Sequence, residues 1–402
     1  MPLITPAEAE ALIFAGIARL PAEDVPLAEA HSRVLRTDVR ADRDLPPFDR
    51  VMLDGYALRS AAWAAGRHAF RIAGTQAAGM IPQELMADDA CIEIATGAVL
   101  PLGADCVVGY EDTAREGGTM KIFPEARLTP GHAVHQRGGD YAAGTVIVPA
   151  GMRLTGREIA VAAACGCATL PVSTRPKIAV IATGDELVDV GAEVGPHQVR
   201  RSNDYALRAA LQAAGWPRVE RFHLHDMRHE IEHALWHILA EFEVVLLTGG
   251  VSKGKFDFLP GVLDDLGVRK KFHGVAQRPG KPFWFGLSPR AQPVFALPGN
   301  PVSSYTCLHR YVLPALARAA GATPEPPRLA ALATPVSFKH PLTYFLPVKL
   351  RSGPAAELLA EPAAVNTSGD FAGLVGTDGF VELPAEKDEF PAGTLAPFWA
   401  WV

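Results

Sequence analysis

The chain has 402 residues, which at roughly 150 residues per domain suggests two to four domains, and a hydrophobic share of 49% excludes a disordered chain. The formal net charge of −6 gives no basic surface, so we expect no nucleic-acid partner. No apolar run reaches about 18 residues, so we also expect no membrane span. The five scattered cysteines argue against a secreted disulfide framework, and with no signal peptide expected, the expected location is cytoplasmic.

The first element in chain order is an expected helix from Thr5 to about Leu20. It begins with Thr5-Pro6-Ala7-Glu8, which has the spacing of a capping box with proline at the first helical position. Between residues 51 and 141, short apolar stretches alternate with glycine and proline turns, a texture typical of a small β domain. Longer apolar segments return around an expected helix at 156–165. We therefore predict a discontinuous N-terminal domain, with the β domain at 51–141 inserted between its two parts, 1–50 and 142–174.

From Lys177 onward, continuous apolar strands alternate with helices. Strands are expected at 177–183, 244–248 and 294–297. Helices are expected at 203–214, 227–240, 258–266 and 301–319. This alternation is typical of a parallel sheet covered on both faces, so residues 175–323 are predicted to form one α/β domain. Prolines at 324, 326 and 327 mark a boundary, and the short strands of 324–402 favour a small barrel or sandwich as the last domain.

All three expected strands end in turn-rich, polar sequence. The first end is Thr183-Gly184-Asp185-Glu186. The second runs from Thr248 to Gly254 and is followed by Asp257, and the third is Leu297-Pro298-Gly299-Asn300-Pro301-Val302-Ser303-Ser304. Because ligands of parallel sheets bind beyond the carboxyl ends of the strands, we expect the three ends to converge on one crevice. The alternative is that they are short structural turns between strands and helices with no binding role.

The residue types at these ends favour an anionic substrate. Glycines let backbone amides approach a ligand and form an anion-binding nest, and a helix N-terminus adds free N–H groups. Arg278 and Lys281 straddle a Pro-Gly turn and suit an oxyanion. Asp185, Glu186 and Asp257 suit Mg²⁺, which takes one or two carboxylates together with substrate phosphates. Ion pairing at the surface is the alternative for these charges.

Two further patterns in the sequence have both a metal-binding and a structural interpretation. His225, His229, His233 and His237 recur every four residues along an expected helix, so pairs of them could chelate a divalent metal. We favour a solvated helix face for this stripe. Cys165-Gly-Cys167 is a weaker indication of a metal site.

Trp399 and Trp401 alternate as in a closing strand, for which core packing is expected.

Segments spread through the whole chain resemble one family. In order they are Pro46-Pro47-Phe48-Asp49, Leu53-Asp54-Gly55-Tyr56-Ala57, Ala95-Thr96-Gly97-Ala98, Gly139-Asp140, Thr183-Gly184-Asp185-Glu186-Leu187-Val188, Arg201-Ser202-Asn203, residues 249–254 with Asp257, Arg278-Pro279-Gly280-Lys281-Pro282, Leu297-Pro298-Gly299-Asn300-Pro301 and Ser368-Gly369-Asp370-Phe371. Together they resemble the MoeA/gephyrin E-domain family, the molybdopterin molybdenumtransferases.

The resemblance implies a fold, a reaction and partners. The fold is multidomain: a MoaB/MogA-like three-layer α/β domain, an inserted small β domain, a discontinuous N-terminal domain and a C-terminal β-barrel. The implied reaction inserts molybdate into adenylylated molybdopterin with Mg²⁺ as cofactor and releases AMP. The implied partners are a second copy of the chain in a homodimer, the small-molecule pterin and oxyanion substrates, the molybdopterin adenylyltransferase and recipient molybdoenzymes.

The resemblance also implies roles for particular residues. The metal ligands would be Asp185, Glu186 and Asp257. The residues at catalytic positions are Asp54, Thr96, Asp140, Glu186, Asp226 and Asp257. The substrate-binding residues are Thr183, Gly184, Gly249, Gly250, Val251, Ser252, Gly254, Arg278, Lys281, Pro298, Gly299, Asn300, Pro301, Ser303 and Ser368.

The chain departs from the family pattern in two places. Arg50-Val51-Met52-Leu53 replaces the Asn-Ser-Ala-Met that often precedes Asp-Gly-Tyr-Ala. In the last domain, Pro341-Leu342-Thr343-Tyr344-Phe345 stands where a Gly-Arg pair is usual, and that arginine helps bind molybdate in relatives. Lys339 and Lys349 are candidates to substitute for it. The alternatives are therefore a diverged, non-catalytic molybdopterin-binding or scaffolding dimer, an enzyme that inserts tungstate, or one that transfers adenylate to molybdopterin.

Overall fold

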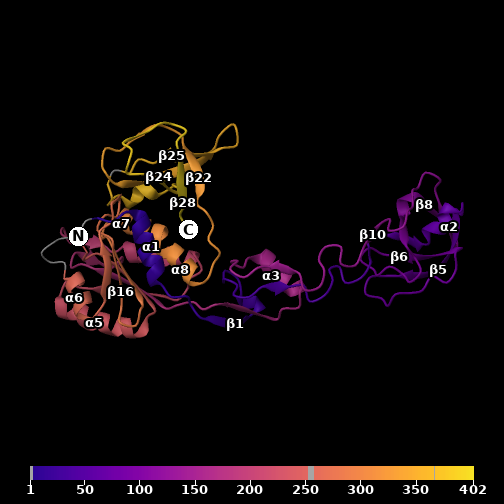
Figure 1. The fold of residues 1–402 in the computed structure, drawn as a ribbon, viewed down its shortest axis with the longest axis horizontal. Coiled ribbons are helices and arrows are strands. Elements are labelled where there is room, and N and C mark those ends of the chain that lie inside the picture. The colour runs from indigo at the N-terminus through magenta and orange to yellow at the C-terminus, as the bar shows by residue number, and fades with distance from the viewer. Residues whose placement is uncertain (1–2, 252–257, 366) are drawn as a thin grey trace. The chain divides into compact units, whose positions relative to one another are not determined.

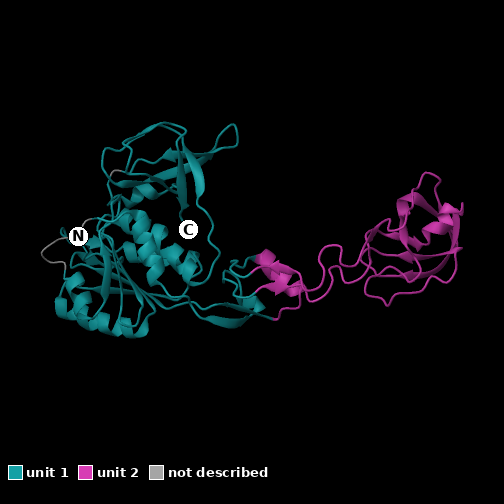
Figure 2. Cartoon of the chain, in the orientation of Figure 1, with its two compact units in different colours: residues 1–37, 150–155, 169–402 teal, residues 38–149, 156–168 magenta. Residues whose placement is uncertain are grey.

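The computed structural model describes residues 3–251, 258–365 and 367–402. The chain forms two compact units (Figure 2). Unit 1 comprises Met1–Thr37, Ala150–Thr155 and Thr169–Val402, and unit 2 comprises Asp38–Pro149 and Gly156–Ala168. Among the described residues, no helix is both long and apolar enough to cross a membrane.

Unit 2 contains a six-stranded sheet with the order β7-β4-β6-β5-β9-β8. Its strands are β4 (Gly55–Leu58), β5 (Ala69–Gln76), β6 (Ala90–Ile94), β7 (Cys106–Gly109), β8 (Thr113–Glu116) and β9 (Thr119–Ile122). A Cβ on Gly55 would collide with the carbonyl oxygen of Val108 on the paired strand, so only glycine fits this position. This close pairing fixes the backbone that follows Asp54.

Short elements complete unit 2. Strand β2 (Val39–Arg40) pairs with β11 (Val146–Val148), and β3 (Arg50–Val51) pairs with β10 (Val134–His135). The helices are α2 (Ser60–Ala64) and α3 (Gly156–Ala164), the second of which begins and ends close to the expected bounds of 156–165.

The sheet of the α/β part of unit 1 has six strands in the order β16-β13-β17-β21-β20-β18. Its strands are β13 (Ile178–Thr183), β16 (Val219–Leu224), β17 (Val244–Thr248), β18 (Arg269–His273), β20 (Trp284–Leu287) and β21 (Pro293–Leu297). The first four strands in this order are parallel, as predicted, whereas β20 pairs antiparallel with both of its neighbours, β21 and β18. The expected strands are therefore present, and β16, β18 and β20 are additional to them.

Helices cover both faces of this sheet, which gives the predicted three layers (Figure 1). Successive residues of β17 point to opposite faces, so Leu246 packs into one core cluster while Val245 and Leu247 pack into another. The first cluster includes residues of α1 (Pro6–Gly16), α4 (Asn203–Ala213), α7 (Pro301–Cys307) and α8 (Leu313–Ala319). The second includes residues of α5 (Arg228–Glu241) and α6 (Leu259–Asp265).

The first helix has the predicted N-terminus. Thr5 Oγ1 accepts from the backbone N–H of Glu8 at 3.2 Å, and the Glu8 carboxylate accepts from the N–H of Thr5 at 2.7 Å. This reciprocal pair is the capping box expected from the sequence. The helix ends at Gly16 rather than near Leu20.

The single helix expected at 301–319 is interrupted. A π-helical segment, Leu308–Val312, separates α7 from α8. Pro314 lies in the first turn of α8 and has no N–H to donate to the preceding turn. A proline within a helix breaks the regular ladder, which accounts for a change of helix type at this place.

The last part of unit 1 is a closed five-stranded barrel with the strand order β24-β25-β22-β28-β26. Its strands are β22 (Arg328–Leu332), β24 (Thr343–Ser352), β25 (Leu358–Pro362), β26 (Gly379–Leu383) and β28 (Leu395–Ala400). Pairing of β24 with β26 closes the barrel, and β19 (Gln277–Arg278) adds to β24 from the α/β part. The predicted barrel is thereby confirmed.

The remaining strands of unit 1 form small two-stranded sheets. These pairs are β1 (Ala22–Pro26) with β12 (Thr169–Ser173), β14 (Leu187–Val188) with β15 (Val199–Arg200), and β23 (Val336–Ser337) with β27 (Glu389–Phe390).

Candidate functional site

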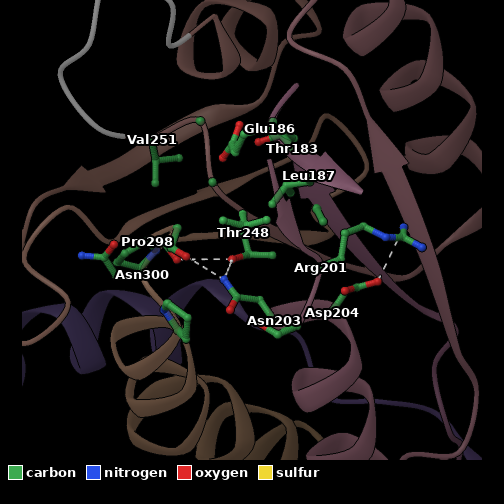
Figure 3. A pocket seen from close by; sticks show the side chains of 18 of the residues that line it. Thr183, Glu186, Leu187, Arg201, Asn203, Asp204, Thr248, Val251, Pro298 and Asn300 are labelled. Carbon is green, nitrogen blue, oxygen red and sulfur yellow. Dashed lines mark hydrogen bonds and ion pairs between the residues drawn. The ribbon is translucent and has the colours of Figure 1, made fainter. Parts of the chain in front are cut away.

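A cavity of about 650 Å³ lies at the carboxyl ends of β13, β17 and β21. The three strand ends that were expected to converge all line it (Figure 3). The predicted site residues among its lining are Thr183, Gly184, Glu186, Asp226, Gly249, Gly250, Val251, Pro298, Gly299, Asn300 and Pro301. Segments far apart in the sequence thus form one hollow.

The first strand end is held by the neighbouring loop after β16. Gly184 has φ +145, and a Cβ there would lie 2.6 Å from the Glu186 carboxylate, so glycine is required. Asp185 Oδ1 accepts from the backbone N–H of Asp226 at 3.0 Å and lies 3.3 Å from His225 Nδ1. The Asp185 side chain thereby joins the two loops, and Glu186 and Asp226 line the cavity itself.

The second strand end passes close to the first. Gly249 and Gly250 have φ values of +98 and +66, and Cβ atoms there would lie 2.6 Å from Thr183 O and 3.0 Å from Thr183 Oγ1. Two glycines are therefore needed for the turn to pack on β13. Val251, which follows this turn, is buried and also lines the cavity. The predicted residues Ser252, Gly254 and Asp257 lie outside the described residues.

Asn203, at the start of α4, joins the second and third strand ends. Its Nδ2 donates to Thr248 Oγ1 at 2.9 Å and to Gly299 O at 2.7 Å (Figure 3). Thr248 Oγ1 in turn donates to Pro298 O at 3.3 Å. Both protons of the amide are used, and its Oδ1 is a buried acceptor without a partner.

Two residues of a charged cluster, Arg201 and Asp204, also line the cavity. Asp204 is fully buried, with Arg221 at 3.1 Å and Arg201 at 3.7 Å from its Oδ2. Arg201 also lies 3.3 Å from Asp189. Sequence reasoning assigned these residues no role, although Arg201 and Asn203 belong to a segment that matched the family. Their position at the start of a helix beside a strand end is the signal that could have identified them.

Unpaired polar atoms are concentrated at this cavity. Among the described residues, six buried side-chain polar atoms have no hydrogen-bond partner, and four belong to residues that line the cavity: Thr183 Oγ1, Arg201 Nε, Asn203 Oδ1 and Asp204 Oδ1. Leaving a buried polar atom unpaired costs about 1–3 kcal/mol. Their concentration here indicates a place built for a polar ligand.

The predicted oxyanion residues lie beside the cavity rather than in its lining. Arg278 and Lys281 are exposed on one turn, and Pro282, directly after it, lines the cavity. Arg278 Nη1 lies 3.4 Å from Nε2 of His340, a barrel residue to which sequence reasoning gave no role. The two lysines considered as substitutes for the missing arginine are both exposed. Lys339 lies 4.0 Å from Glu389, and Lys349 lies on β24.

Ser368 connects the barrel to the third strand end. Its Oγ accepts from Asn300 Nδ2 at 2.7 Å, and its carbonyl accepts from the N–H of Val302 at 3.1 Å. The next residue, Gly369, lines the cavity. Ser303 is buried in α7 and does not belong to the lining.

Three predicted catalytic residues belong to unit 2. Asp54 Oδ1 accepts from the N–H of Thr96 at 2.7 Å and from its hydroxyl at 2.8 Å, and these bonds, the backbone one first, lower the pKa of Asp54. Asp140 lies 3.1 Å from His135 Nε2, whose Nδ1 lies 3.1 Å from Arg50 Nη2. Arg50, a departure from the family pattern, thus has a partner in this unit.

No metal centre is evident among the described residues: no group of three or more histidine, cysteine or acidic side chains could hold an ion. His229, His233 and His237 are exposed on α5, with the last two rings edge to face at 4.7 Å. This fits the favoured interpretation of a solvated helix face. The cysteines, including Cys165 and Cys167, are all free.

Three protein-family models match the chain in succession. The MoeA N-terminal region (domain I and II) matches residues 4–166. A probable molybdopterin binding domain matches residues 179–318, and the MoeA C-terminal region (domain IV) matches residues 330–401. Together these regions span nearly the whole chain.

Relatives and solved structures agree with this assignment. The molybdopterin molybdenumtransferase of Synechocystis is 43% identical over 373 residues, covering 92% of this chain and 93% of the relative. That of Staphylococcus epidermidis is 30% identical over 379 residues, covering 92% and 89%. Two structures of the molybdopterin biosynthesis MoeA protein from Pyrococcus horikoshii cover 100% of both chains, with TM-scores of 0.81 and 0.85 and identities of 30% and 26%. The chain therefore belongs to the MoeA family, the molybdopterin molybdenumtransferases.

Proposed function

We propose that the chain inserts molybdate into adenylylated molybdopterin, with Mg²⁺, and releases AMP. The observation that carries this proposal is the cavity at the three strand ends, where glycine turns, carboxylates and unpaired buried polar atoms meet. The names of the relatives at 43% and 30% identity support the molybdopterin and molybdenum part of it.

The cavity suits the adenylylated pterin. The glycine turn at Gly249 and Gly250 has the conformation in which successive amides can face an anion, here the phosphate group that joins the two halves. Asn203 and Thr183 line the cavity, and each has a buried side-chain oxygen without a partner, which favours a polar ring or ribose as the ligand. A cavity of about 650 Å³ lies within the size range of cofactor sites.

The carboxylates of the cavity fit Mg²⁺. Glu186 and Asp226 line it, and Asp185 is adjacent, so one or two carboxylates could hold the ion together with phosphate oxygens. Bound there, Mg²⁺ would neutralise charge on the phosphate as AMP leaves. Asp257, the third proposed ligand, lies outside the described residues.

The exposed turn with Arg278 and Lys281 is the proposed molybdate site. Molybdate is a tetrahedral dianion, which an arginine fork and an ammonium group attract. Ser368, held by Asn300 beside the cavity, offers a hydroxyl from the barrel. The proposal also includes the homodimer, the adenylyltransferase and the recipient molybdoenzymes as partners, and it keeps Asp54, Thr96 and Asp140 as functional residues of unit 2.

The test uses the full chain with adenylylated molybdopterin, Mg²⁺ and molybdate. AMP release that rises with molybdate is expected. Glu186→Gln should lower that release about tenfold or more, because the cavity loses one negative charge that faces the metal. The matched control is Asp264→Asn, which removes an exposed carboxylate from α6 and should leave the rate unchanged.

Other outcomes would select the alternatives. AMP release without dependence on molybdate would contradict the proposal. Pterin binding with no AMP release would favour a scaffolding dimer. A clear preference for tungstate over molybdate in competition would identify an enzyme that inserts tungstate. Transfer of adenylate from ATP to molybdopterin would identify an adenylyltransferase instead.

A further inference from the structure

A buried polar network lies behind the turn that carries Arg278 and Lys281. Its members are Gln277, Cys307 and Tyr311, which expose at most 1% of their surface. A glutamine side chain is seldom buried so completely without hydrogen-bond partners. The proposed function gives none of the three a role.

The turn itself is closed by backbone bonds. Val275 N donates to Lys281 O at 2.9 Å, and Phe283 N donates to Gly280 O at 3.1 Å. The Gln277 side chain fills the inside of this loop, where its Nε2 donates to Pro279 O at 3.2 Å and to Cys307 Sγ at 3.4 Å. The loop is therefore organised around one amide group.

The partners fix the orientation of that amide. Pro279 O can only accept, so the amide must present its Nε2 to the turn. The Gln277 Oε1 then faces the hydroxyl of Tyr311, which donates to it. Burial raises the pKa of Tyr311 and the pKa of Cys307, so both groups keep their protons. Every hydrogen-bonding atom of the Gln277 side chain is thus used.

Two features tie this network to the helix behind it. Tyr311 belongs to the π-helical segment Leu308–Val312. Such segments are rare in proteins, and those that occur are often found at functional sites. Gly280 packs so closely that a Cβ would lie 2.5 Å from Gln277 Nε2 and 2.7 Å from Cys307 Sγ. The turn and the helix are therefore fitted to each other.

We propose that Gln277, Cys307 and Tyr311 are positioning residues that hold Arg278 and Lys281 in the geometry that binds the oxyanion. This inference rests on the proposed function. Arg278 and Lys281 are exposed, long side chains, so their common orientation depends on the backbone that presents them. Small displacements of binding groups have large effects on rate and affinity.

The first test is Tyr311→Phe, which removes only the hydroxyl that holds Gln277. The KM for molybdate and its dissociation constant in calorimetric titration should each rise about tenfold, by loss of one buried hydrogen bond. The KM for adenylylated molybdopterin should stay unchanged, which a general loss of structure would not produce. Thr306→Val is the control, because it removes a buried hydroxyl of the adjoining helix α7 that donates to Val302 O within that helix and not to the network.

A double-mutant cycle provides the second test. Gln277→Met and Tyr311→Phe each break the network, so the double variant should bind molybdate no more weakly than the weaker single variant. Additive losses, unchanged molybdate affinity in Tyr311→Phe, or equal weakening of both substrates would overturn the inference. If the unaltered chain binds molybdate and releases AMP, these contrary results would overturn the positioning role and leave the proposed function intact. If the unaltered chain does neither, the proposed function fails and the inference fails with it.

Discussion

Asp54 in unit 2 is an exposed carboxylate whose charge is stabilised by one neighbouring residue. Thr96 donates both its backbone N–H and its hydroxyl to the same oxygen, Asp54 Oδ1. Hydrogen bonds to the charged form stabilise it, so the pKa of Asp54 is lowered in the folded chain. Asp54 therefore stays ionised at lower pH than a free aspartate would.

Thr96→Val should raise the pKa of Asp54 toward its ordinary value, because the hydroxyl bond is lost while the backbone bond remains. An NMR titration of the Asp54 carboxyl carbon measures this shift. Thr113→Val is the control, since that hydroxyl faces Gly109 O and Tyr110 O in the same unit. An Asp54 titration curve that does not move would show that the hydroxyl plays no part.

Among single residues, the sequence predicted those that belong to short continuous motifs. Gly184, Gly249 and Gly250 belong to glycine turns that follow apolar strands and match the family pattern, and all three line the cavity at positive φ. His340 was missed for a physical reason, because its partner Arg278 is 62 residues away and no local pattern encodes a contact at that separation. The pairing of Asp204 with Arg221, 17 residues away, is hidden in the same way, although its pairing with Arg201 is local.

The π-helical segment also determines how the chain end is held. His309 is buried, its Nδ1 lies 2.9 Å from Tyr305 O and its Nε2 lies 3.2 Å from Val402 N. A carbonyl accepts and an amide donates, so Nδ1 carries the proton and Nε2 accepts. Burial lowers the pKa of His309 from 6.5 to about 4, and protonation of Nε2 would break the bond to Val402.

This histidine should make stability depend on pH. Its pKa is lower in the folded chain than in the unfolded chain, so the unfolded chain takes up more protons as the pH falls from 6.5 toward about 4. The stabilisation from neutral His309 is complete above pH 6.5 and decreases below it, by about 3 kcal/mol at the acid end. In urea unfolding, His309→Gln should lose less stability over this range than the unaltered chain. His229→Gln, on the exposed face of α5, should keep the original slope, and equal slopes in all three proteins would contradict the assignment.

Two of the three strands that the sequence did not predict, β16 and β18, share a reason, whereas the third, β20, is an interior strand with buried residues. β13, β17 and β21 are buried on both faces and are continuous apolar runs, which is why they were predicted. β18 begins Arg-Lys-Lys, and β16 carries Glu220 and Arg221. Both are edge strands of the sheet, so half of their side chains face solvent and the apolar signal is lost.

At the scale of the whole molecule, one buried arginine connects three parts of unit 1. Arg310, in the π-helical segment, pairs with Glu10 of α1 at 2.7 Å and with Glu382 of β26 at 2.9 Å. Its guanidinium also lies 4.3 Å from the ring centroid of Trp399 on β28. The N-terminal helix, the α/β helices and the barrel are therefore joined at a side chain that is only 5% exposed.

Arg310→Met should lower the free energy of unfolding by about 3–5 kcal/mol, because two partly buried carboxylates lose their counter-charge. Urea unfolding measures the loss, and hydrogen exchange of β28 should show whether the barrel loosens first. Adding Glu10→Gln and Glu382→Gln to this variant should restore part of the stability, since the unpaired charges are then removed. The control is Lys177→Met, which breaks the more exposed pair with Glu241 and should cost about 1 kcal/mol or less. A loss of that small size in Arg310→Met would mean that apolar packing alone, and not the ion pair, joins the barrel to the helices.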